Sequence, residues 1–253
     1  MCVLAFAWQA HPRWRLIAAG NRDELHARPA AALHHWPAPS PLIAGQDLAS
    51  GGTWMGVSDQ GRFAVVTNLR GYGGPEPDRA SRGALVCDML AGNGHYAAPS
   101  DADLADFNPF NLIVADRERA DFLSNRPGAI RSPLTSGIYG LSNGRLDEPW
   151  PKTIRLKAIL LDWIVNDATD PAALLSGLAE ATLPAAGLQP ASPSDVPEEA
   201  LLSPIFIRNA VYGTRCSTVV AIDMEGQGRI IERRFAADGS ATGETALSFR
   251  WPG

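Results

Sequence analysis

The chain alternates between short apolar segments and clusters of polar or turn-forming residues, a pattern typical of β-strands. Segments of this kind cover residues 2–8, 15–20, 54–57, 63–68, 111–115, 120–124, 137–141, 217–222 and 228–235. Because few residues join some of these segments, hairpins are expected around residues 9–13, 58–61 and 223–226. The pattern predicts at least nine strands.

Helical spacing of apolar residues is confined to a few segments. Residues 81–90 form one of them, and 151–165 is the clearest, because Pro151 suits the first turn of a helix. Asp170 is a suitable N-cap for a third helix that reaches about residue 181. Residues 184–199 contain four prolines together with Ser, Asp and Glu, and predict a loop.

Strands, then helices, then strands again predict an α+β architecture with a mainly antiparallel sheet. A chain of 253 residues, 45% of them hydrophobic, is long and apolar enough to bury a sizeable core. Neither an internal repeat nor a domain boundary is evident. We therefore expect residues 1–253 to form a single domain.

Charge and cysteine content narrow the classes of function. The net charge of −5 gives no sequence-wide basic surface for nucleic acid, and no apolar run approaches the roughly 18 residues that cross a bilayer. The apolar start of the chain lacks a basic leading segment and a cleavage site. The three cysteines are too scattered for a disulfide framework or a metal site. These features favour a cytoplasmic protein with a small-molecule ligand, without nucleic-acid binding or membrane insertion.

Cys2 is the residue with the clearest chemical potential. An initiator Met before a small residue is commonly removed, and this would give Cys2 a free α-amine. Such an amine titrates at about pH 7.7–8.0 and can act as general base for the thiol of the same residue. The alternative is that Cys2 is a small buried hydrophobic residue at the start of a strand.

The first hairpin adds weight to the catalytic interpretation. With its tip at residues 11–12, antiparallel pairing places Cys2 opposite roughly Asn21, next to the charged segment 20–24. An Arg beside a cysteine lowers the pKa of the thiol, and a nearby carboxylate can orient an ammonium group. The alternative for this segment is a solvated turn closed by its own ion pairs.

Other candidate residues have simpler alternatives. Asn68 ends an apolar strand, where its amide could donate to an oxyanion or merely form a turn. Asn143 precedes a glycine, which favours turn formation, and Arg215 could bind an anionic group. Tyr72 lies in a glycine-rich segment expected at the rim of a site. The adjacent His34 and His35 are expected in a loop without a metal.

The segment Asn21-Arg22-Asp23-Glu24 behind an N-terminal Met-Cys resembles the NRDE family, the homologues of the transport and Golgi organisation 2 protein. Residues 52–56, 61–68 and 111–116 resemble further sequence blocks of this family, in the same order. The resemblance extends from residue 1 to about residue 222 and weakens after residue 157.

This family is similar in turn to the N-terminal-nucleophile (Ntn) hydrolases of the bile-salt-hydrolase and penicillin-acylase type. The resemblance implies a four-layer αββα sandwich, with two mainly antiparallel sheets and helices outside. It also implies an N-terminal cysteine that attacks a non-peptide amide, assisted by Arg, Asp and Asn. The catalytic positions carried over are Cys2, Arg22, Asp23 and Asn68, and those expected to bind the ligand are Asn21, Glu24, Tyr72, Asn143 and Arg215.

The match to those hydrolases is incomplete. They usually read Arg-Asn-x-Asp, whereas here Asn21 precedes Arg22 and two acids follow, so the choice between Asp23 and Glu24 stays open. The family resemblance also implies a non-enzymatic alternative, an intracellular carrier of haem or of acyl-CoA and lipid that uses the same pocket. Apart from haem in that alternative, no cofactor and no metal are expected.

Overall fold

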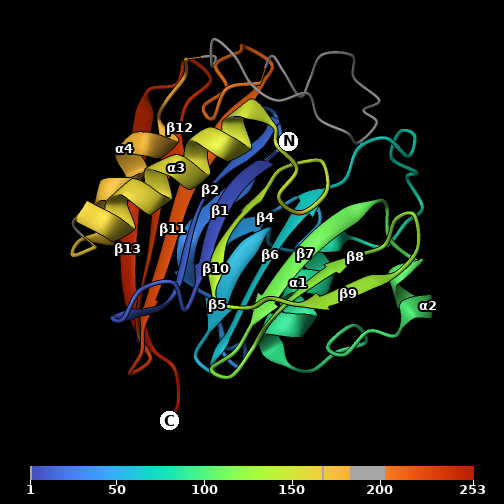
Figure 1. Cartoon of the computed structure of the whole chain (residues 1–253). Coiled ribbons are helices and arrows are strands. Elements are labelled where there is room, and N and C mark those ends of the chain that lie inside the picture. Colours follow the sequence, from blue (N-terminus) through green and yellow to red (C-terminus); the bar gives the residue numbers. More distant parts are fainter. Residues whose placement is uncertain (1, 167, 183–202) are drawn as a thin grey trace.

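Two antiparallel β-sheets lie face to face in the computed structural model, which describes residues 2–166, 168–182 and 203–253 (Figure 1). The first sheet has the strand order β10-β1-β2-β11-β12-β13 and the second the order β3-β4-β5-β6-β7-β8-β9. The strands of the first sheet are β1 (Cys2–Trp8), β2 (Trp14–Leu25), β10 (Gly137–Leu141), β11 (Tyr212–Asp223), β12 (Gln227–Phe235) and β13 (Ala241–Arg250). Those of the second are β3 (Ala30–His35), β4 (Leu42–Asp47), β5 (Met55–Ser58), β6 (Arg62–Asn68), β7 (Phe110–Ala115), β8 (Ala120–Ser124) and β9 (Ile130–Pro133).

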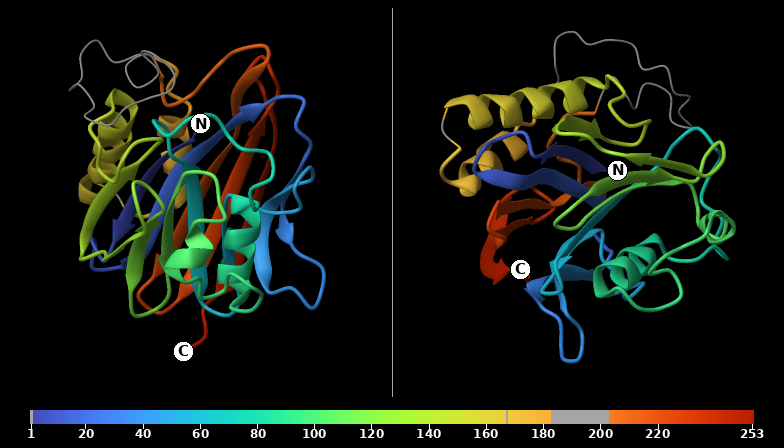
Figure 2. Two further views of the ribbon diagram at one scale, coloured as in Figure 1. Left: turned by 90° about the vertical axis from the view of Figure 1, so that its right-hand side faces the viewer. Right: turned by 60° about the horizontal axis from the view of Figure 1, so that its bottom comes forward.

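Helices cover the outer face of each sheet. The first sheet carries α3 (Pro151–Asn166), η1 (Pro171–Ala173) and α4 (Leu174–Leu178), and the second carries α1 (Arg82–Ala91) and the short α2 (Asp101–Leu104) (Figures 1 and 2). The helices are apolar where they contact the sheets. Leu156 and Leu160 of α3 pack on β1, and Leu85 and Val86 of α1 pack on β6. The layer order is therefore αββα, as the family resemblance implied.

Strand β1 is apolar at every position because both of its faces are buried. Its residues alternate between the two sides of the sheet: Leu4 and Phe6 enter the core between the sheets, whereas Val3 and Ala5 face the helices. The rings of Phe6 and Phe63, one from each sheet, stack with centroids 5.7 Å apart. The space between the sheets is thus filled by side chains along most of its length.

The nine expected strands are all present, but two of them are longer than expected. Strand β2 continues through the charged segment to Leu25, and β11 begins at Tyr212. The sequence pattern did not indicate β3, β4, β9 and β13, and the prediction that His34 and His35 lie in a loop is wrong, because both belong to β3. The third expected helix is shorter, formed by η1 and α4. The loop expected at residues 184–199 lies outside the described residues. Within the described part of the chain, no helix combines the length and apolarity needed to cross a membrane.

Candidate functional site

Three residues on neighbouring strands form a row across the first sheet. Cys2 of β1 pairs with Arg22 of β2, and Arg22 pairs on its other side with Cys216 of β11. Because directly paired residues point to the same face, all three side chains point between the sheets. The sequence argument placed Asn21 opposite Cys2, so the expected register was wrong by one residue; since side chains alternate, this shift puts Arg22 beside Cys2.

The thiol of Cys2 lies in a buried position at the end of the inter-sheet core. Burial raises the pKa of this thiol, and the charge of Asp23 raises it further, while the Arg22 guanidinium lowers it. The hydroxyl of Ser142 donates to the backbone carbonyl of Cys2 over 2.8 Å and fixes the start of β1. Cys2 is therefore a shielded thiol whose ionisation depends on the charges around it.

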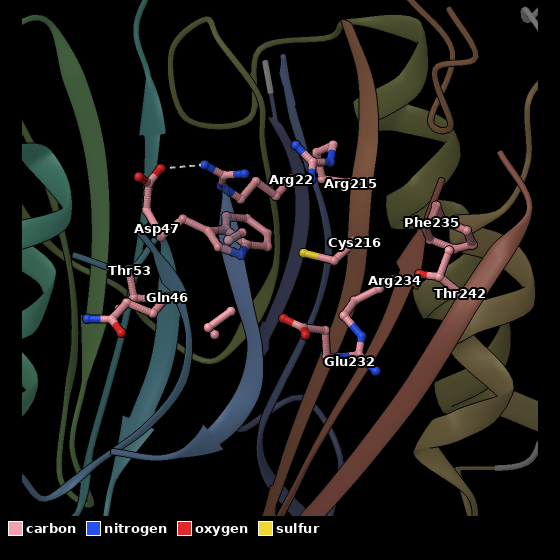
Figure 3. A pocket seen from close by; sticks show the side chains of 14 residues that line it. Arg22, Gln46, Asp47, Thr53, Arg215, Cys216, Glu232, Arg234, Phe235 and Thr242 are labelled. Atoms are coloured by element: carbon pink, nitrogen blue, oxygen red, sulfur yellow. Dashed lines mark hydrogen bonds and ion pairs between the residues drawn. The ribbon is translucent and has the colours of Figure 1, made fainter. Parts of the chain in front are cut away.

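Arg22 joins the two sheets through an ion pair. Its Nη2 lies 2.7 Å from Oδ2 of Asp47 at the end of β4, as the dashed line in Figure 3 shows, and Arg28 Nε lies 2.6 Å from the same oxygen. Both guanidinium groups lower the pKa of the Asp47 carboxyl. The side chains of Arg22 and Asp47 are only 11% and 12% exposed. The pair holds Arg22 in place beside Cys2.

Asp23 and Glu24 occupy different environments. Asp23 is buried, and its Oδ1 accepts a hydrogen bond of 2.6 Å from Thr214 Oγ1. Burial raises the pKa of the Asp23 carboxyl, and the nearby positive charge of Lys152 opposes this rise. Glu24 instead lies 3.8 Å from Arg22 and 4.0 Å from Arg28. The structure thus separates a buried carboxyl next to Cys2 from a more exposed one near the guanidinium groups.

A cavity of about 380 Å³ opens over the thiol and is called the Cys2 cavity below. Its wall includes Cys2, Arg22, Asp23, Glu24 and Asn68. Further lining comes from Arg28, Asp47, Gly52, Thr53, Trp54, Val66, Glu76, Arg79, Arg82, Gly83 and Asn108. All four expected catalytic residues therefore meet at one cavity, whereas Tyr72 is not among the described residues that line it.

A second cavity of about 200 Å³ lies between the sheets on the other side of Arg22 (Figure 3). Cys216, Glu232 and Arg234 project into it from β11 and β12. Burial raises the pKa of the Glu232 carboxyl and of the Cys216 thiol. Arg22 and Asp47 line both cavities, so their ion pair forms part of the wall between them.

Three residues expected to bind the ligand, Asn21, Asn143 and Arg215, make hydrogen bonds within the protein. Asn21 is fully buried on the helix side of the sheet, where its amide donates to the carbonyls of Leu178 and Ile205. Asn143 donates to the backbone carbonyl of Asn68 over 2.8 Å and so positions that residue.

Arg215 has the same kind of role in the turn that follows β2. Its Nη1 donates to the carbonyls of Leu25 and Arg28 while its side chain reaches the edge of the second cavity.

Sequence reasoning missed Asp47, Arg82 and Lys152. Lys152 is fully buried in the first turn of α3 and acts on Asp23, and it is one of two lysines in the chain. That rarity, together with its place at a helix start, was the available signal. Asp47 ends a strand whose pattern was not recognised, so nothing in the sequence connected it with Arg22.

Among the described residues, one group of His and acidic side chains is close enough to share a metal ion: His95, Asp103 and Asp106. None of the three lines the Cys2 cavity. The chemistry that the Cys2 cavity offers is therefore that of a thiol, paired guanidinium groups and carboxyl groups.

Comparisons with known sequences identify one family. The sequence profile of the family Transport and Golgi organisation 2 matches residues 1–237. The transport and Golgi organization protein 2 homologue of Bos taurus is 33% identical over 97% of both chains, and that of Homo sapiens is 31% identical over 92% of both.

Solved structures of two hydrolases show a similar fold. One is a Caenorhabditis elegans orthologue of N-acylethanolamine-hydrolyzing acid amidase, with a TM-score of 0.50 and 15% identity over 86% of this chain and 92% of the other. The second is a mutant conjugated bile acid hydrolase from Clostridium perfringens, with a TM-score of 0.50 and 8% identity over 98% and 92%. The sandwich of two sheets is thus that of the Ntn hydrolases, and the chain belongs to the transport and Golgi organisation 2 family.

Proposed function

We propose that this protein is an N-terminal-cysteine amidohydrolase that cleaves a non-peptide C–N bond of a small molecule once Met1 has been removed. The observation that carries the proposal is the pairing of Cys2 with Arg22 at a cavity that Asp23 also lines. The similarity of the fold to two amide-bond hydrolases supports it.

In the proposed reaction, the α-amine of processed Cys2 accepts the thiol proton, and the thiolate attacks the substrate carbonyl carbon. Arg22 favours the thiolate because its guanidinium lowers the pKa of Cys2. The negative charge of Asp23 stabilises the ammonium group formed when the amine takes up the proton. Asn68, whose backbone is held by Asn143, donates to the oxyanion of the tetrahedral intermediate.

The second half of the reaction restores the enzyme. The C–N bond breaks as the ammonium group returns its proton to the leaving nitrogen, which departs as a neutral amine. Water then adds to the thioester with the α-amine as general base, and the carboxylic acid is released from the regenerated thiol. No redox partner is needed for either half.

The test combines a measurement of the intact mass of the protein with an assay of amide hydrolysis. The mass of the purified protein should lack the initiator methionine, and a panel of small N-acyl substrates should be hydrolysed by the parent chain but not by Cys2→Ala. Cys87→Ala is the matched control, because Cys87 is a half-buried cysteine that is not among the described residues lining the Cys2 cavity. Absence of turnover with Met1 demonstrably removed would end the hydrolase proposal. Binding of haem or acyl-CoA unaffected by Cys2→Ala would then support a carrier.

A further inference from the structure

Most charges in the Cys2 cavity have a partner of opposite sign within the cavity wall. Arg22 and Arg28 share Asp47, and Glu24 lies within 4.0 Å of both. Each guanidinium in this part of the wall therefore faces carboxylates that already neutralise it.

The outer rim shows the same balance. Arg79 pairs with Glu76 over 3.0 Å, and the Glu76 side chain is largely exposed. The positive charge of Lys152, which is not among the described residues lining the cavity, acts on Asp23. A ligand gains little new charge pairing from any of these groups.

Arg82 is different from the other cations of this cavity. It is the first residue of α1, and its Nη1 donates to the backbone carbonyl of Pro109 over 3.0 Å. Among the described residues, the ion pairs within 4.0 Å include none to Arg82. Its positive charge therefore has no direct carboxylate partner in the part of the chain that is described.

The position of Arg82 is unfavourable for a cation. Burial lowers the pKa of its guanidinium, and the neighbouring charges of Arg70 and Arg28 lower it further, whereas negative charge on Cys2 or Glu24 raises it. The start of a helix is also the positive end of the helix dipole, which disfavours a basic residue there. A bound anion would offset both costs.

The backbone fixes this arginine at the cavity. A Cβ on Gly52 would lie 2.4 Å from the carbonyl carbon of Gly83, so the two backbones are in direct contact next to Arg82. Both glycines line the Cys2 cavity. The start of α1 is thus held against the loop before β5, and the cavity extends from Arg82 to Cys2.

We propose that Arg82 binds an anionic group of the substrate, so that the molecules cleaved at Cys2 are amides that carry a carboxylate or a phosphate. This inference rests on the proposed function for the reaction, whereas the anion site itself can be tested without turnover. Arg82 is then a specificity-determining residue. The scissile carbonyl lies at Cys2 on the first sheet, and the charged end of the substrate is bound at the start of α1 on the second.

The experiment compares two small thiol reagents, anionic iodoacetate and neutral iodoacetamide. Each alkylates Cys2 by displacement of iodide, and peptide mass spectrometry follows the rate at one fixed pH. With Arg82 intact, iodoacetate is expected to react with a rate that saturates as its concentration rises, whereas the rate with iodoacetamide rises linearly. Arg82→Gln should lower the iodoacetate-to-iodoacetamide rate ratio by roughly tenfold, the size of a lost charge-assisted hydrogen bond.

Two controls separate the explanations. Arg79→Gln removes a cation of the same cavity that is already paired with Glu76, and it should leave the ratio unchanged. If Arg82 only stabilised the thiolate, Arg82→Gln would slow both reagents equally, and this result would overturn the proposal. An unchanged ratio, or no labelling of Cys2 by either reagent, would overturn it as well.

The outcome is independent of hydrolysis. A selective loss of iodoacetate reactivity in a protein that hydrolyses no amide would retain the anion site and reject the hydrolase. Turnover of neutral amides, with an iodoacetate-to-iodoacetamide rate ratio that Arg82→Gln leaves unchanged, would retain the hydrolase and reject the anion site.

Discussion

Arg22 of one sheet and Asp47 of the other form an ion pair of 2.7 Å that forms part of the wall between two cavities. The pair adds a polar contact to the mainly apolar packing between the two sheets. Arg22 is also the direct neighbour of Cys2 in the sheet. A substitution at Asp47 therefore acts on the Cys2 thiol through one side chain, that of Arg22.

Asp47→Asn should destabilise the protein by about 3 kcal/mol, the lower end of the cost of removing one partner from a buried ion pair. The substitution leaves Arg22 and Arg28 without their nearest carboxylate, while Oδ1 can still accept from the backbone of Ala49 and Ser50. Urea unfolding followed by circular dichroism measures the loss.

The control for that substitution is Glu244→Gln, which breaks an exposed pair with Arg233. Its expected cost is at most about 1 kcal/mol, because exposed ion pairs contribute little. Equal losses of stability in the two variants would show that the Arg22–Asp47 pair contributes no more to stability than an exposed ion pair.

Asn21→Ala should lower stability strongly while leaving the thiol chemistry of the folded protein unchanged. It removes the donors to Leu178 and Ile205 and the acceptor for Ser217 Oγ, all at a fully buried site. Unsatisfied buried groups cost about 1–3 kcal/mol each, so a loss of roughly 2–4 kcal/mol is expected. The check is chemical unfolding together with the Cys2 alkylation rate; a changed rate in the folded variant would assign Asn21 to the site.

The hairpin of β1 and β2 was predicted well from the sequence because its signals are local. An apolar run, a Pro-containing turn and a second apolar run determine β1, β2 and their pairing to within one residue. The error arose because the charged segment was expected to leave the sheet after Gly20. In the structure β2 continues to Leu25, since Asn21 and Asp23 find hydrogen-bond partners on the helix side.

The rest of the site depends on contacts between segments that are far apart in the chain. Asp47 reaches Arg22 from β4, and β4 belongs to a sheet whose outer strands show too little apolar alternation to be recognised. Lys152 acts on Asp23 of β2 from α3, a helix more than a hundred residues further along the chain. Hydrophobic periodicity carries no information about such pairs, so they became visible only in three dimensions.

Glu232→Gln should make the protein more stable at neutral pH. Burial raises the pKa of Glu232 above that of the unfolded chain, so between the two values the folded state binds more protons. Stability therefore declines as the pH rises through the folded-state pKa. Gln keeps an oxygen for the backbone N–H of Leu33, which donates to Glu232 Oε1 over 2.9 Å, and carries no charge.

Thermal unfolding from pH 4 to 8 measures this difference. The variant should lack the part of the decline that Glu232 causes, and its advantage over the parent chain should grow with pH. An advantage that shrinks as the pH rises would mean that the Glu232 carboxylate is stabilised by its surroundings.

Lys152 and Asp23 should behave as an energetically coupled pair, so that substituting both costs less stability than the sum of the two single substitutions. Each is buried, and the positive charge of Lys152 lowers the pKa of Asp23 against the effect of burial. Lys152→Met leaves the Asp23 charge without this stabilisation, and Asp23→Asn leaves a buried ammonium group without this carboxylate. In the double variant neither charge is present, so its loss of stability should be smaller than the sum by roughly 0.5–3 kcal/mol. A double-mutant cycle by urea unfolding at pH 7 measures that coupling. Strictly additive losses would show that Lys152 does not act on Asp23.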